Sequence, residues 1–274
     1  MAVHRQLRSA LFVPASRPDR FAKALDSGAD AVIIDLEDAV EHDAKDRARR
    51  DLQEFAAANP DASFLVRIND GATRWFDDDL AACRELPNIS GIVLPKTETA
   101  EQAYSVVGAG KAVIPMIETA RGIEVLDQIA GVEGVRRLSF GVLDLLLDLG
   151  VTPGTPSADI VINQLRFQIL VRSRMHRLGS PLDSIYPDFS DFEGLAAAAR
   201  NACDMGFCGM LCIHPAQIEV VHQTFQPSPD DLDWARRVVA HAEQAGTAAF
   251  KLDGRMVDVP VIERARRIVA RAGG

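Results

Sequence analysis

Polar side chains that can do chemistry recur in this 274-residue sequence where short apolar runs end. They are Asp35, Glu37, Asp38, Arg67, Asn69, Lys96, Glu118, Asp144 and His214. Each alone is explained by a helix cap or an ion pair. Their recurrence at the ends of apolar runs indicates one shared site, with carboxylates for a metal ion and cationic groups for an anionic substrate.

Glu118 and Asp144 follow consecutive apolar runs, so we expect their carboxylates to lie close together. Two carboxylates completed by water and substrate oxygens are the usual setting for Mg²⁺, which keeps much of its hydration shell. The alternative is that each acid stabilises the start of the helix or turn that follows it. Position alone favours neither interpretation.

Arg67 lies within an otherwise apolar segment, Val66-Arg-Ile-Asn. An arginine there must be paired or must face the site, because burying an unpaired charge is prohibitive. Its guanidinium suits a bidentate partner, so we expect it to bind a substrate carboxylate. Asp35 or Glu37 is the structural alternative, and both interpretations can hold at once. On the same predicted rim, Lys96 and Asn69 are further candidates for substrate contacts.

The chain between these residues alternates short runs rich in valine and isoleucine with amphipathic stretches, which predicts strands connected by helices. The expected strands are residues 10–13, 31–36, 64–68, 91–94, 112–117, 137–141, 182–186 and 210–213. The expected helices are 20–27, 44–58, 76–85, 100–107, 121–129, 157–178, 192–205 and 217–224. Eight such units predict a (β/α)8 TIM barrel, whose active site lies at the carboxyl ends of the strands. No glycine-rich dinucleotide fingerprint follows the first strand, which disfavours an open doubly wound sheet.

The last part of the sequence does not continue this alternation. We expect residues 1–225 to form the catalytic barrel domain and residues 226–274 to form a C-terminal helical extension, with helices at 230–245 and 261–272. A glycine-flanked segment, 250–259, connects these two helices. We expect the extension to cover a barrel mouth, either its own or a neighbour's.

The composition limits the partners and the compartment. The formal net charge of −9 argues against nucleic acid and against an anionic membrane, since both require a basic surface. No run is long enough for a signal peptide or a membrane span, so the cytoplasm is the expected location. A metal site of Cys208, Cys212 and His214 is conceivable, but no Cys-x-x-Cys pair occurs, and buried thiols are favoured.

Motifs of a known family occur in order along nearly the whole chain. Among them are Gly28-Ala-Asp-Ala-Val-Ile-Ile-Asp-Leu-Glu-Asp-Ala-Val, Leu94-Pro-Lys, Ile117-Glu-Thr-Ala-Arg-Gly-Ile, Phe140-Gly-Val-Leu-Asp and Asp253-Gly-Arg-Met-Val-Asp. Together with Val66-Arg-Ile-Asn, they resemble the citrate lyase β-subunit-like family within the HpcH/HpaI aldolase superfamily. That resemblance implies cleavage or formation of citryl, malyl or citramalyl thioesters, with an acetyl-type thioester and a 2-oxo acid as the other partners.

The resemblance also implies roles for individual residues. Glu118 and Asp144 correspond to the Mg²⁺ ligands, and Arg67 corresponds to the residue that grips the oxo-acid carboxylate. Asp258 is similar to a catalytic aspartate that relatives supply from an adjacent protomer, which implies a homo-oligomer, commonly a trimer or hexamer. The carrier of the acyl group is coenzyme A or an acyl carrier protein.

Three positions depart from the family pattern, and they leave the substrate open. Leu143 stands where relatives usually have Glu, Leu146 replaces a small residue, and Met210 stands where relatives usually have Lys. The alternatives are a class II aldolase that acts on free 2-oxo acids, a malyl-CoA-type thioesterase, and a barrel that binds a metabolite without turnover. The aldolase branch usually relies on a His after the second strand, where this chain has Asp35-Leu-Glu-Asp.

Overall fold

The computed structural model describes residues 7–245 and 249–272. Eight parallel strands form one sheet in the order β6-β5-β4-β3-β2-β1-β8-β7. They are β1 (Ser9–Pro14), β2 (Ala31–Asp35), β3 (Phe64–Arg67), β4 (Ile89–Leu94), β5 (Val113–Ile117), β6 (Ser139–Phe140), β7 (Leu182–Asp183) and β8 (Gly209–Cys212). The backbone N–H of Leu182 donates to the carbonyl of Leu138 at 3.1 Å, which joins the two ends of the sheet. The predicted (β/α)8 barrel is confirmed.

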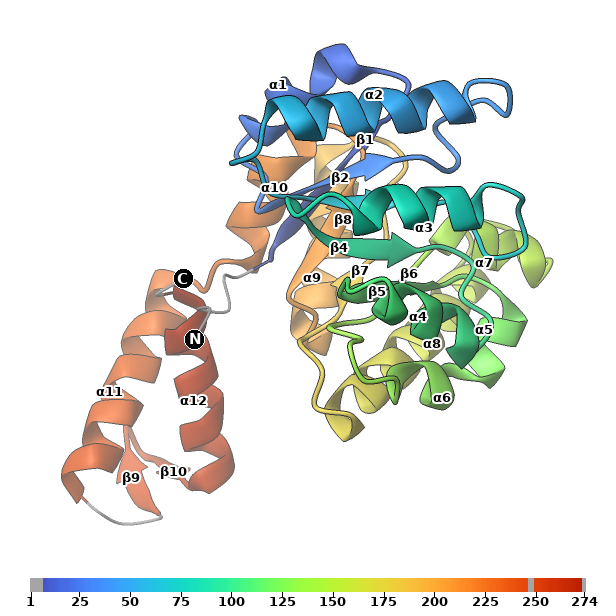
Figure 1. The fold of residues 1–274 in the computed structure, drawn as a ribbon. Helices are drawn as coiled ribbons and strands as arrows, with labels where there is room; N and C mark the ends of the chain where they lie inside the picture. Colours follow the sequence, from blue (N-terminus) through green and yellow to red (C-terminus); the bar gives the residue numbers. More distant parts are fainter. Residues whose placement is uncertain (1–6, 246–248, 273–274) are drawn as a thin grey trace.

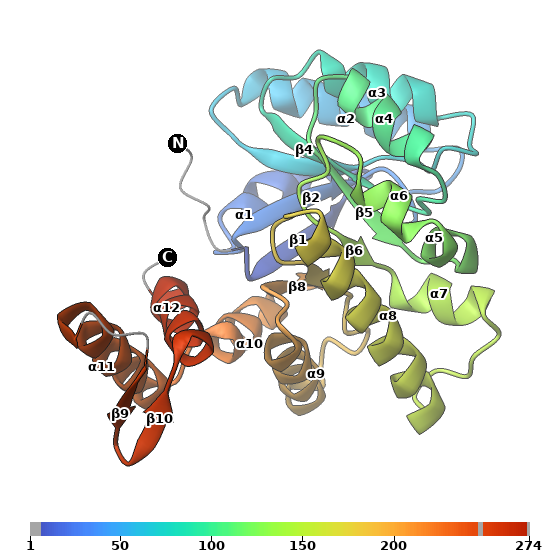
Figure 2. The same cartoon turned by 90° about the horizontal axis from the view of Figure 1, so that it is seen from below.

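Helices surround this sheet, as Figures 1 and 2 show from two directions. They are η1 (Pro18–Arg20), α1 (Phe21–Leu25), α2 (Lys45–Ala58), α3 (Phe76–Arg84), α4 (Ala100–Gly108), α5 (Ala120–Glu124), α6 (Leu126–Ala130), α7 (Val142–Asp148), α8 (Pro156–Met175), α9 (Phe192–Met205) and α10 (Ala216–Phe225). Side-chain caps fix where several of them begin. The side chain of Thr119 accepts a hydrogen bond from the backbone N–H of Gly122. This cap begins α5 next to Glu118.

The strands alternate between two hydrophobic layers, because successive side chains of a strand point to opposite faces. Ile33 and Leu65 belong to the cluster inside the barrel, whereas Val32 and Val66 pack in the larger cluster toward the helices. The same period of two continues to the carboxyl ends of β2 and β3, where Asp35 and Arg67 are paired in register. The alternation therefore directs these two polar side chains toward the interior at the barrel mouth.

The structure differs from the expected elements around β5 and β6. Two short helices, α5 and α6, replace one helix predicted over 121–129, and they meet at Val125. The segment after β6, where a turn was expected, forms α7 instead. Its first turn is held by Ser184, whose hydroxyl accepts from the backbone N–H of Val142 at 2.9 Å. This long-range contact has no local sequence signal.

The C-terminal extension folds around a small core of its own. It contains α11 (Pro229–Ala245), the antiparallel strands β9 (Phe250–Leu252) and β10 (Arg255–Val257), and α12 (Val259–Ala272). The hairpin was not predicted. The turn is Asp253-Gly254, with φ of 48° and 78°, which suits a tight two-residue connection. Both views show this extension on the side of the barrel opposite α7 (Figures 1 and 2).

No helix within residues 7–245 and 249–272 combines the length and the apolar character needed to cross a membrane.

Candidate active site

A cavity of about 360 Å³ lies at the carboxyl ends of the strands. Glu118, Asp144 and Arg67 all line it, so the structure brings these three predicted site residues together. A larger cavity, of about 790 Å³, lies between α9, the segment after α10 and α12. None of the strand-end residues lines that larger space, so size does not identify the site here. The chemistry of the lining residues points to the smaller cavity.

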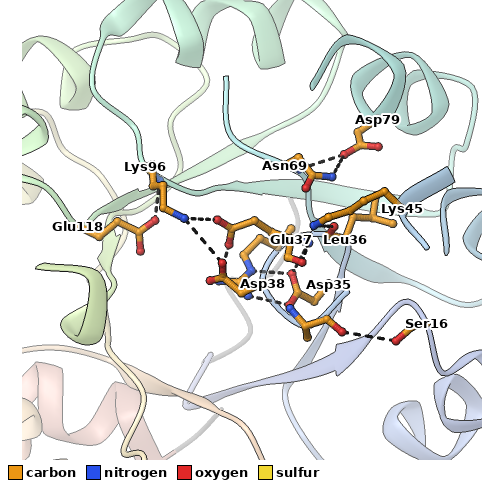
Figure 3. A network of polar contacts seen from close by, with 12 residues as sticks. Ser16, Asp35, Leu36, Glu37, Asp38, Lys45, Asn69, Asp79, Lys96 and Glu118 are labelled. Atoms are coloured by element: carbon orange, nitrogen blue, oxygen red, sulfur yellow. Dashed lines mark hydrogen bonds and ion pairs between the residues drawn. The ribbon is translucent and has the colours of Figure 1, made fainter. Parts of the chain in front are cut away.

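Glu118 is almost completely buried, with 1% of its surface exposed. Its Oε1 accepts a hydrogen bond of 2.6 Å from the backbone N–H of Lys96 (Figure 3). Burial, together with the nearby carboxylates of Glu37 and Asp144, raises the pKa of Glu118 to about 8. At neutral pH this side chain therefore keeps a proton unless a cation compensates its charge.

Lys96 provides this hydrogen bond from an unusual backbone conformation. Its φ is +42°, in the left-handed region that side chains with a Cβ rarely adopt. The Nζ of Lys96 forms ion pairs with Glu37 and, at 3.7 Å, with Asp38. The neighbouring carboxylates raise the pKa of Lys96 against the opposing effect of burial, so the amine stays charged. These ion pairs stabilise the turn that positions the backbone N–H toward Glu118.

Gly141 leaves room for the carboxylate of Glu118 at the start of α7. A Cβ at this position would overlap Oε2 of Glu118. Asp144 lies in the first turn of the same helix and lines the same cavity. The absence of a side chain at residue 141 therefore allows the two predicted metal ligands to approach each other.

Arg67 forms the ion pairs that the sequence offered as its structural alternative. Its Nε and Nη2 each donate to Asp35 at 2.7 Å, and its Nη1 lies 3.0 Å from Glu37. The guanidinium also lies over the ring of Phe12, 4.7 Å from its centre. Arg67 lines the cavity as well, so both interpretations of this residue remain compatible with the structure.

Glu37 sits between the two cations of this network. Burial raises its pKa to about 7, although Arg67 and Lys96 oppose that shift. One of its oxygens contacts Lys96, and the other lies near Arg67 without the geometry of a hydrogen bond. Asp35, Glu37 and Asp38 therefore hold Arg67 and Lys96 in place. The segment that carries these acids is itself fixed by Lys45, which donates to the carbonyls of Leu36 and Glu37 (Figure 3).

Three predicted site residues are not among those that line this cavity, namely Asn69, Lys96 and Asp258. The Nδ2 of Asn69 donates to Asp79 of α3 at 2.6 Å, which gives this buried amide a structural partner. Asp258 precedes α12, and its carboxylate accepts from the backbone N–H of Val261 at 3.3 Å. Their assignments to substrate binding and catalysis stay predictions. Because the extension lies on the side opposite α7, it does not cover the mouth of its own barrel.

Two contributors to the site were missed at the level of sequence. Phe12 supports Arg67, and Ser184 positions α7. Phe12 had a readable signal, since it shares the inward register of β1 with Ala10.

No group of three or more His, Cys, Asp or Glu suited to a metal ion occurs in the part of the chain that is described. The thiol of Cys208 accepts a hydrogen bond from the guanidinium of Arg137 and donates one to the carbonyl of Ser180.

The geometry can be compared with known proteins. The sequence model of the HpcH/HpaI aldolase/citrate lyase family matches residues 8–215. This chain belongs to that family. It is 38% identical over 267 residues to a citrate lyase subunit beta-like protein of Mycobacterium tuberculosis, covering 96% of this chain and 94% of that protein. It is 35% identical over 277 residues to a (3S)-malyl-CoA thioesterase of Cereibacter sphaeroides, covering 97% and 94%.

A solved structure gives the same result for the fold. CitE from Mycobacterium tuberculosis, in complex with magnesium, acetoacetate and coenzyme A, superimposes with a TM-score of 0.86 at 35% identity. The match covers 99% of this chain and 100% of that chain. The predicted family and the assignment to a family of lyases are confirmed, and magnesium in this neighbour agrees with the predicted cofactor.

The pKa of Glu118 predicts how stability depends on pH when no divalent cation is present. The carboxyl releases its proton near 4.5 in the unfolded chain but near 8 in the folded one, so stability falls as pH rises between these values. One proton corresponds to a slope of about 1.4 kcal/mol per pH unit. Glu118→Gln removes this part of the slope. Urea unfolding with a chelator at several pH values measures it, and parallel profiles for the two proteins would contradict the prediction.

Gly141→Ala tests whether the approach of Glu118 to α7 matters for the metal. The added methyl group overlaps the carboxylate, so we expect Mg²⁺ affinity to fall at least about tenfold. Titration calorimetry measures this affinity. The matched control is Gly108→Ala at the end of α4, where the added methyl group meets no atom within 4 Å. A wild-type Mg²⁺ affinity in Gly141→Ala would show that metal binding does not require the carboxylate of Glu118 to lie against residue 141.

Proposed function

We propose that this protein is a Mg²⁺-dependent carbon–carbon lyase. It cleaves, or forms, a 3-hydroxyacyl thioester such as citryl-, malyl- or citramalyl-CoA, with an acetyl thioester and a 2-oxo acid as the other partners. The observation that carries the proposal is the presence of Glu118, Asp144 and Arg67 on one small cavity. Two acids suit a divalent cation, and the guanidinium suits the carboxylate of an oxo acid.

Glu118 and Asp144 would hold Mg²⁺ with one carboxylate each. The fit rests on Glu118, which is buried close to two other acids and has a raised pKa, so a cation relieves a charge that water cannot reach. A pair of carboxylates is a common protein contribution to a magnesium site, because water and substrate oxygens complete the shell. Bound there, Mg²⁺ would supply Lewis-acid polarisation of the oxygen of the oxo acid. Magnesium in the solved CitE supports this choice of metal.

The reaction breaks the bond between the hydroxyl-bearing carbon and the α-carbon of the thioester. A base accepts the proton of the hydroxyl, whose oxygen becomes the carbonyl oxygen of the oxo acid, while the electron pair of the broken bond stays on the α-carbon. A proton then reaches that carbon and completes the acetyl thioester. In this scheme Arg67 orients the carboxylate of the oxo acid, and Asp258 carries the proton at the α-carbon.

In this proposal Asp258 comes from a second copy of the chain. In its own chain the extension lies opposite α7, and Asp258 does not line the mouth cavity. The extension of one protomer would therefore complete the barrel of another, in a trimer or a hexamer. Coenzyme A in the solved neighbour supports a free coenzyme A thioester over an acyl carrier protein.

A thioesterase is the second candidate, because a relative at 35% identity carries that name. Hydrolysis of a malyl thioester releases the free thiol and leaves the carbon skeleton intact. An aldolase on free oxo acids is less well supported, because that branch usually relies on a His after the second strand, where this chain has Asp35-Leu-Glu-Asp. Asp35, at the end of β2, is fully engaged by Arg67 and by the backbone N–H groups of Glu37 and Ala39.

Purified protein with malyl-CoA, citramalyl-CoA or citryl-CoA and Mg²⁺ distinguishes these reactions. The lyase releases a 2-oxo acid without free thiol, and the thioesterase releases free thiol without an oxo acid.

We expect Glu118→Gln and Asp144→Asn to lower kcat about a thousandfold or more while leaving the fold intact, because each removes a ligand of the Lewis acid. Free thiol as the main product would refute the lyase proposal, and wild-type rates in either variant would refute the metal site at Glu118 and Asp144.

Mixing two inactive variants tests the shared site. Asp258→Ala keeps the metal ligands, and Glu118→Gln keeps the extension, so a mixed oligomer contains sites in which both parts are intact. Random assembly of equal amounts places both intact parts in about a quarter of the sites. We expect co-expressed variants to recover about that fraction of activity. No recovery, with mixed oligomers shown by mass spectrometry, would mean that Asp258 does not act across the interface.

A further inference from the structure

The charges on the cavity wall restrict which oxo acid fits. Arg67 is the one basic residue among the described residues that line the cavity. Four acidic residues share this wall, and two of them are the proposed metal ligands. The other two, Asp35 and Asp38, lie close to the guanidinium. A substrate with a second carboxylate would therefore find no further cation in the part of the wall that this chain supplies.

The remainder of the wall is mostly apolar. Met116 and Leu211 are buried, with 3% and 2% of their surfaces exposed, and both belong to the cluster inside the barrel. Both also line the cavity, and Phe12 and Ile185 pack against the same cluster. A carboxylate placed against such a surface loses its hydration without gaining a partner, whereas a methyl group gains favourable burial.

Leu143 extends this apolar wall to the metal ligands. It precedes Asp144 in the first turn of α7 and lines the cavity, although 48% of its surface is exposed. A leucine exposed to this extent adds little to the folded core. Because Leu143 lines the cavity next to Asp144, its apolar side chain is placed to contact a bound substrate.

We propose that the site selects thioesters whose hydroxyl-bearing carbon carries one carboxylate and an alkyl group, with Leu143 as a specificity-determining residue. The 2-oxo acid half is then a monocarboxylic methyl ketone of the pyruvate type. This inference rests on the proposed lyase function. It ranks the three thioesters by the substituent on the hydroxyl-bearing carbon. The methyl group of citramalyl-CoA is preferred to the hydrogen of malyl-CoA. That hydrogen is preferred to the carboxymethyl group of citryl-CoA, whose extra charge finds no cation in the wall of this chain.

The wild-type enzyme with Mg²⁺ gives the first test. We expect kcat/KM to be highest for citramalyl-CoA, lower for malyl-CoA, and at least about tenfold lower for citryl-CoA than for citramalyl-CoA. Equal or higher kcat/KM for citryl-CoA would overturn the inference while leaving the lyase proposal intact. If no thioester released an oxo acid, the lyase proposal itself would fail.

Leu143→Ala tests the residue directly. We expect this change to lower kcat/KM for citramalyl-CoA about tenfold, because a contact with the methyl group is lost, and to change it less than about twofold for malyl-CoA. The matched control is Leu147→Ala, one turn later on α7. Leu147 is 80% exposed and does not line the cavity, so neither substrate should be affected. Equal losses for both substrates in Leu143→Ala would refute the role of Leu143 in specificity.

Binding of the free acids provides a readout that does not depend on turnover. Calorimetric titration of the Mg²⁺-loaded protein with pyruvate, glyoxylate and oxaloacetate should give the highest affinity for pyruvate. Leu143→Ala should reduce affinity for pyruvate more than for glyoxylate. Tightest binding of oxaloacetate would overturn the inference whether or not any thioester is cleaved.

Discussion

A carboxylate removed from water requires either a proton or a cation, and Glu118 is placed under this constraint by the fold. The end of β5 buries it, the backbone N–H of Lys96 fixes one of its oxygens, and Gly141 leaves space for the other. Asp144 lines the same cavity. The burial of one acid beside others is unfavourable without a compensating charge. A bound divalent cation would resolve this conflict, so the proposed metal site and the electrostatics of the barrel mouth have a common physical cause.

The ion pairs around Arg67 and Lys96 serve this arrangement indirectly. Asp35 fixes the plane of the guanidinium with two hydrogen bonds, and Glu37 connects it to the amine of Lys96. Because both cations are tied to the segment after β2, the left-handed turn at Lys96 is held in place. The same engagement leaves little free positive charge in the cavity. We propose that a site built in this way orients one substrate carboxylate, because this chain supplies no second cation to the cavity wall.

Much of the fold was predictable because strand and helix periods are local properties of the sequence. The eight strands and the convergence of Glu118, Asp144 and Arg67 follow from where apolar runs end. Other features depend on contacts between distant residues. Ser184 starts α7 from across the barrel, and no local pattern signals it. The hairpin turn at Asp253-Gly254 did have a signal, since this dipeptide favours tight turns, but the segment was predicted only as a connection between two helices.

The most direct measurement is a crystal structure of the protein soaked with Mg²⁺ and pyruvate. We expect one octahedral ion with an oxygen of Glu118 and an oxygen of Asp144 at about 2.0–2.1 Å, and with the oxo acid completing its shell. An ion bound elsewhere, or no ion at these two carboxylates at saturating Mg²⁺, would contradict this expectation.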